Sequence, residues 1–235
     1  MPFGWGKKGE PAALDTTALD AFGRALPGDP GSTGPAQGWT EKNTHDLLGR
    51  DLPLFTEFIA GRAKSSVGGG ALRFLLPATH PSLVAWNARS GWHSDWPSTQ
   101  PGVVFATDWI GRLFLLLPRV KGKGGEPGLG LLVPMTGESI LLDYSFGEFL
   151  GEALVNEWRD LLEIARLEEW NAAGNATPRF DEVVAPKQPL VLGGSDDISE
   201  MEITPLVVAV SFGGQIWEQV KDLPPGTSIS GVSIK

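Results

Sequence analysis

The stretch VVFATDWIGRLFLLL, residues 103–117, decides the fold. Its two apolar runs, VVFA and LFLLL, flank a connection that contains Gly111. Strand-forming runs on both sides of a short segment with a glycine are typical of a β-hairpin. Further apolar runs follow at residues 129–133 and 140–142. This part of the chain therefore predicts neighbouring strands in a mainly antiparallel sheet.

A capped helix follows these runs. Ser145 and Glu148 have the spacing of a capping box, and apolar residues then recur at helical intervals. The pattern predicts one helix over residues 146–173, ended by Gly174. Hairpin-type runs before a long amphipathic helix favour an α+β fold over alternating βαβ units. We expect a twisted sheet with this helix packed across one face and Trp158 buried there.

The chain divides into two predicted regions. Residues 1–79 are rich in helix and loop signals, and residues 80–235 are predicted to form the α+β domain. The expected helices lie at residues 15–26, 44–48, 53–63, 81–90 and 213–221. Further strands are expected at residues 72–76, 189–192, 205–210 and 229–234.

Composition and charge exclude several classes of function. The 235 residues carry a net charge of −9 and include no cysteine, which removes disulfides and thiolate chemistry. We find no basic stripe for nucleic acid, no apolar run long enough to span a membrane and no secretory signal. The expected location is the cytoplasm. Residues 151–200 hold eleven acidic and four basic residues, which suits either a solvated helix face or a docking surface for a basic partner.

No constellation of residues points to catalysis, and we expect no metal or cofactor. The three histidines, at positions 45, 80 and 93, are not spaced as a metal-binding pair. His93 and Asp95 have the residue types of a hydrolase site, but neighbours in sequence rarely face each other as base and orienting group. A hydrolase that uses these two residues remains the enzyme alternative.

A group of tryptophans gathers around turns. Four tryptophans, at positions 86, 92, 96 and 109, lie near Gly91 and Gly102. Such rings either cap the sheet or form a binding hot spot. Under the second interpretation, the candidate partner-binding residues are Trp92, Asp95, Trp96, Asp196, Asp197 and Glu200.

Several segments resemble a known family when they are taken in order. FATDWIGRLF at residues 105–114 is similar to the hairpin motif of the SUKH superfamily, and LDYSFGEFL at residues 142–150 is similar to the entry to that superfamily's last core helix. The segments PLVLGGSDD at residues 189–197 and GGQI at residues 213–216 resemble the C-terminal domain of type VI secretion immunity proteins that neutralise DNase toxins. The resemblance covers roughly residues 80–235.

The resemblance implies a cytosolic protein that is not an enzyme and that binds and neutralises a cognate toxin, a nuclease with a basic surface. An acidic chain would be steered to such a surface. The alternative is a SUKH-like intracellular scaffold or regulatory protein without a toxin partner. Such families diverge most at the binding surface, so the resemblance assigns no contact residue.

Overall fold

A six-stranded antiparallel sheet forms the centre of the computed structural model, which describes residues 14–224, 226–229 and 231–234. Its strands follow one another in chain order, so each pairs with its neighbour in sequence. They are β1 (Ser66–Val67), β2 (Leu72–Phe74), β3 (Val103–Asp108), β4 (Leu113–Lys121), β5 (Pro127–Val133) and β6 (Glu138–Leu142). Two further strands, β7 (Glu182–Pro186) and β8 (Met201–Pro205), form a separate antiparallel ribbon. The predicted α+β fold with an antiparallel sheet is confirmed.

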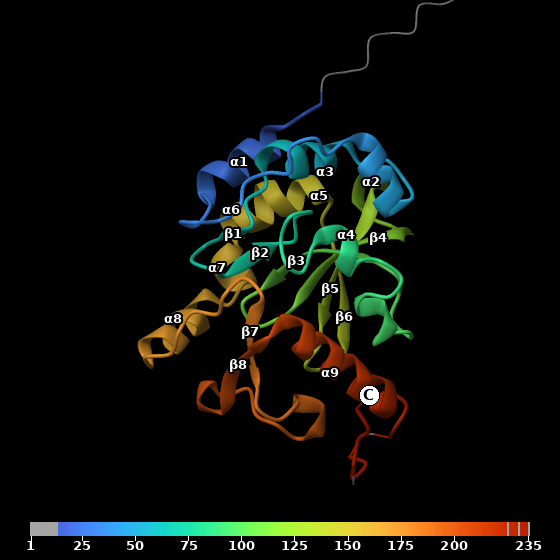
Figure 1. The fold of residues 1–235 in the computed structure, drawn as a ribbon, viewed down its shortest axis with the longest axis vertical. Coiled ribbons are helices and arrows are strands. Elements are labelled where there is room, and N and C mark those ends of the chain that lie inside the picture. The colour runs from blue at the N-terminus through green and yellow to red at the C-terminus, as the bar shows by residue number, and fades with distance from the viewer. Residues whose placement is uncertain (1–13, 225, 230, 235) are drawn as a thin grey trace, which may run out of the picture.

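Helices gather at two ends of the sheet. Figure 1 shows the N-terminal helices together with α5 and α6 at one end, and α9 with the β7–β8 ribbon at the other. The helices are α1 (Thr17–Ala25), α2 (Glu41–Leu48), α3 (Pro53–Glu57), α4 (Leu83–Trp86), α5 (Phe146–Glu148), α6 (Leu154–Asn156), α7 (Trp158–Leu161), α8 (Ile164–Ala172) and α9 (Leu206–Val220). A single buried apolar core extends from Leu19 to Val210.

The predicted boundary at residue 79 does not separate two folding units. Strand β2 pairs with β3 across it, in a register that aligns Arg73 with Thr107. The ring of Phe74 also packs against Phe22 and Phe105, which lie on opposite sides of the boundary in sequence. The N-terminal helices therefore complete the core of the sheet.

The predicted helix start is confirmed at Ser145. Its side chain accepts a hydrogen bond from the N–H of Glu148 at 3.2 Å, and the Glu148 carboxylate accepts one from the N–H of Ser145 at 2.8 Å. The Phe149 ring lies 5.9 Å from the ring of Phe105 on β3 and 5.4 Å from the ring of Phe114 on β4. The beginning of the helix thus packs on one face of the sheet, as predicted.

The prediction of one uninterrupted helix to residue 173 is wrong. A π-helical turn occupies Phe149–Ala153, and the chain leaves helical geometry at Glu157, with φ −123° and ψ 6°. It breaks again at Glu163, whose φ of 52° lies in the left-handed region. Trp158 consequently sits at the first turn of α7, half-buried instead of buried, with its ring over Gly68.

The hairpin between β3 and β4 explains the second break. The indole N–H of Trp109 donates to the carbonyl of Leu162 at 2.8 Å, and Arg112 donates to the carbonyl of Leu161 at 2.7 Å. Arg112 also pairs with the Glu163 carboxylate at 2.9 Å. Carbonyls that lose their helical partners at a break need new donors, and the hairpin supplies them. The periodicity of apolar residues cannot predict this helix break, since the donors lie about fifty residues away in sequence.

Buried Asp108 and Arg73 hold the hairpin in place. The Asp108 carboxylate accepts hydrogen bonds from the N–H groups of Ile110, at 3.2 Å, and Arg112, at 2.9 Å, and it pairs with the Arg112 guanidinium. Arg73 donates to the carbonyls of Asp108 and Arg179, each at 2.6 Å. Burial lowers the pKa of Arg73 to about 10, against the opposing effect of Asp108 and other nearby carboxylates. This network joins β2, the hairpin and the segment before β7.

Three strand predictions after residue 180 are wrong. Residues 189–192 contain only a single 3₁₀ turn, and no strand lies in the described part of residues 229–234. Residues 206–210 begin helix α9. An apolar run such as LVVAV does not distinguish a strand from a buried helix by its period.

Candidate functional site

Helix α9 has one buried and one exposed apolar face. Leu206, Val210 and Ile216 are buried in the protein. The opposite face carries Val207, Val208 and Phe212, whose side chains are 41%, 51% and 37% exposed. Apolar side chains that gather on an exposed helix face are typical of an interaction surface.

Two glycines let α9 approach its neighbours closely. A Cβ on Gly213 would lie 2.4 Å from the carbonyl oxygen of Pro134, and one on Gly214 would lie 2.4 Å from the carbonyl oxygen of Asp95. The indole N–H of Trp96 fills the remaining space by donating to the carbonyl of Val210 at 2.9 Å. These contacts hold the loop of Asp95 against α9.

Gly214→Ala is therefore expected to destabilise the protein by about 1–3 kcal/mol, as overpacking does. The sign is informative, because in an unobstructed helix interior alanine is more stable than glycine by about 1 kcal/mol. Gly23→Ala in α1 is the matched control, since no atom lies within 4 Å of its added Cβ. Urea unfolding should show opposite signs for the two variants. Stabilisation by both would contradict the close approach.

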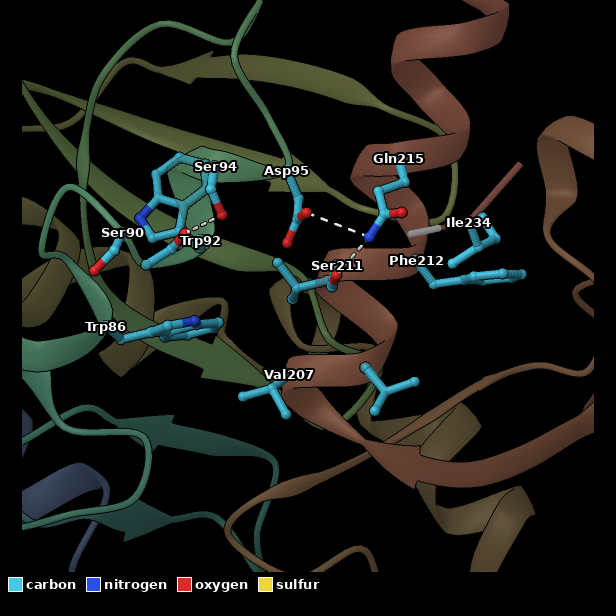
Figure 2. A pocket seen from close by; sticks show the side chains of 13 residues that line it. Trp86, Ser90, Trp92, Ser94, Asp95, Val207, Ser211, Phe212, Gln215 and Ile234 are labelled. Atoms are coloured by element: carbon cyan, nitrogen blue, oxygen red, sulfur yellow. Dashed lines mark hydrogen bonds between the residues drawn. The ribbon is translucent and has the colours of Figure 1, made fainter. Parts of the chain in front are cut away.

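A groove of about 430 Å³ lies between α9 and the loop around residues 90–95. Figure 2 shows Trp86 and Trp92 on the loop side and Val207 on the helix side. The Gln215 amide donates to Asp95 Oδ1 at 3.3 Å and to Ser211 Oγ at 3.0 Å. The groove thus combines aromatic and aliphatic walls with one carboxylate.

A second hollow, of about 230 Å³, lies on the other side of the exposed face. Val208 and Phe212 line both hollows, so they form a ridge between them. The remaining walls of the second hollow come mainly from Pro134, Met135, Ala185, Pro186, Pro189 and Val191. We call this ridge and its two hollows the α9 surface.

The structure corrects the interpretation of the loop tryptophans. Trp92 is 2% exposed, and Trp96 and Trp109 are fully buried. Trp92 also donates its indole N–H to the side chain of Asn87 at 3.2 Å. Trp92 and Trp96 are therefore part of the core, and of the two only Trp92 lines the groove.

The predicted acidic residues fall in two places. Asp95 lines the groove beside α9. Asp196, Asp197 and Glu200 lie in the connection between β7 and β8, and they line neither hollow of the α9 surface. Asp196 approaches Arg166 of α8 at 3.9 Å. Hydrogen bonds from the Ser199 side chain and backbone N–H lower the pKa of Asp197, which caps the next turn.

His93 and Asp95 do not converge on one cavity. His93 lines a different hollow, with Leu47, Gly102 and Arg119. Its ring stacks on Trp92 with 3.9 Å between the ring centroids, and burial lowers its pKa. The pair that the hydrolase alternative requires is not brought together in this structure.

Sequence analysis missed the residues of the α9 surface. The only signal for Val208 and Phe212 was the apolar character of residues 205–210 and of the following segment, which we interpreted as a strand and a separate short helix. On a helix of fifteen residues the same letters divide into two apolar faces. That division becomes visible only once the element type is known.

None of the helices formed by residues 14–224, 226–229 and 231–234 is long and apolar enough to cross a membrane. Within the same ranges, no group of three acidic or histidine side chains is arranged to hold a metal ion.

Comparisons with known proteins identify a similar fold and no family. No protein-family model matches the chain, and no curated protein matches it either. The crystal structure of Atu4351 from Agrobacterium tumefaciens is similar, with a TM-score of 0.56 over 84% of this chain and 88% of that one. The TM-score shows that the chain shares its fold with Atu4351. Because the two sequences are only 13% identical, the likeness concerns the fold alone.

Proposed function

We propose that this protein is an immunity protein: it binds a toxin, one with a basic surface such as a nuclease, and neutralises it by stoichiometric binding. The α9 surface carries this proposal. It offers an exposed apolar ridge between two hollows, the arrangement in which a partner can bury a few side chains deeply.

Charge supports a basic partner. The chain carries a net charge of −9, and the only charged side chain among the described residues that line the groove is Asp95. The resemblance of the hairpin and helix-entry motifs to the SUKH superfamily is a second support for the proposal. A nuclease must be basic where it meets phosphate, so an acidic inhibitor complements that face.

Growth protection tests the proposal. The probe is the product of the gene beside this one, expressed in cells with and without this protein. We expect growth arrest with the neighbouring product alone and recovery when both are expressed. Arrest that this protein does not relieve, or a neighbouring product without toxicity, would contradict the immunity function and leave the scaffold alternative.

Reversing the charge at Asp196 and Asp197 should slow association with the toxin. Long-range attraction to a basic partner raises the association rate even from acids outside the contact. For Asp196→Lys with Asp197→Lys we expect the association rate to fall about tenfold at low salt and much less at high salt. Surface plasmon resonance at two ionic strengths measures this. An unchanged rate at low salt would show that these acids do not steer the partner.

A further inference from the structure

We propose that the groove beside α9 binds a lysine or arginine side chain of the toxin, with the cationic head at Asp95 and the apolar stem between Trp86 and Val207. This inference rests on the proposed function, and it names the group that the partner inserts. The rest of the α9 surface then accommodates the apolar residues around that side chain.

The charge of the groove points to a cation. Asp95 is half-buried at the groove wall, and Figure 2 shows its carboxylate directed toward α9. Its hydrogen bond is the long one to Gln215, at 3.3 Å, and no lysine, arginine or histidine of the described ranges forms an ion pair with it. A carboxylate that is partly shielded from water and lacks an ion-pair partner is stabilised by a basic group from outside.

The walls of the groove suit the stem of the same side chain. Trp86 lies on the loop side, and Val207 lies on the helix side. Tryptophan rings attract ammonium and guanidinium groups, and lysine and arginine bury their methylenes along apolar surface. A volume of about 430 Å³ lies near the lower end of the range for ligand pockets, which suits one long side chain.

The second hollow does not share this chemistry. Glu202 and Lys187 both line it, so its charges balance, and the Lys187 ammonium donates to the carbonyl of Ser199 at 2.9 Å. Its other walls are mainly apolar. The preference for a cation therefore belongs to the groove of Asp95.

A neutral substitution is the first test. Asp95→Asn keeps the shape of the side chain and removes its charge, and binding to the purified product of the neighbouring gene is measured by calorimetry. We expect the affinity to fall about 10- to 100-fold, as when one member of a desolvated charge pair is lost. Asp160→Asn on α7 is the control: it makes the same charge change at an exposed position away from the groove and should bind like the parent.

A charge exchange is the second test. Asp95→Lys should abolish binding, and a panel of toxin variants, each with one lysine or arginine changed to glutamate, should include one that restores it. Two outcomes overturn this inference and leave the proposed function standing. In the first, the parent binds and Asp95→Asn binds equally well; in the second, the parent binds but no toxin variant restores binding to Asp95→Lys. A parent that does not bind the neighbouring product overturns the proposed function together with this inference.

Discussion

Replacing Asp108 with alanine is expected to lower the free energy of unfolding by about 3–5 kcal/mol, the cost of removing one partner from a buried ion pair. Asp108 is fully buried, and its carboxylate closes the β3–β4 hairpin through two backbone N–H groups and Arg112. Without it, Arg112 keeps Glu163 as its carboxylate partner, while buried Arg73 loses the carboxylate that stabilises its charge most. The hairpin should become less stable, and so should the hydrogen bonds that it donates to the carbonyls of Leu161 and Leu162 at the helix break.

Thermal and urea unfolding measure this effect. For a chain of this length the midpoint should fall by about 6–20 °C. Asp160→Ala, which removes an exposed carboxylate from α7, should change stability by no more than about 0.5 kcal/mol. A loss below about 1 kcal/mol in Asp108→Ala would contradict the structural role of the network.

The largest effect on binding is expected from the ridge of the α9 surface. Changing Val208 and Phe212 together to serine removes the two side chains that border both hollows. Because both are exposed in the free protein, stability should change little, while the free energy of binding to the toxin should weaken by about 2–4 kcal/mol. That corresponds to about 30- to 1,000-fold in the dissociation constant.

The edge strand β6 offers a matched control. Ile140 and Leu141 are also exposed, at 38% and 58%, and they lie outside the two hollows. Their double serine variant also replaces two exposed apolar side chains by serine, on another surface, and should bind like the parent. If instead the β6 variant loses binding and the α9 variant keeps it, the partner docks at the sheet edge. If the parent is a dimer that the α9 variant converts to a monomer, the surface joins two copies of this chain.

The sequence predicted the elements whose signals are local. The β3–β4 hairpin and the capped start at Ser145 depend on neighbouring residues, and both were placed correctly. The breaks at Glu157 and Glu163 were both missed. For the break at Glu163 the reason is that the donors to the freed carbonyls come from Trp109 and Arg112, far away in sequence. The exposure of Trp158 follows from the first of these breaks.

The candidate site was less accessible to prediction. Asp95 was identified as a candidate and lines the groove. The sequence left open whether Trp92 and Trp96 cap the sheet or form a binding hot spot, and the structure buries both. The burial of Trp96 depends on α9, which fits against the loop because Gly214 lacks a side chain. That contact joins segments more than a hundred residues apart, and no local pattern encodes it.

Hydrogen–deuterium exchange of the protein, alone and in complex with the neighbouring gene's product, tests the docking role of the α9 surface most directly. Burial of the ridge and its hollows should slow exchange in α9 and in the loop that carries Asp95. In the β7–β8 connection, residues 195–200, which include Asp196 and Asp197, should change little, because they line neither hollow and their acids act at a distance. Slower exchange confined to that connection or to β6, with α9 unchanged in the complex, would contradict the account.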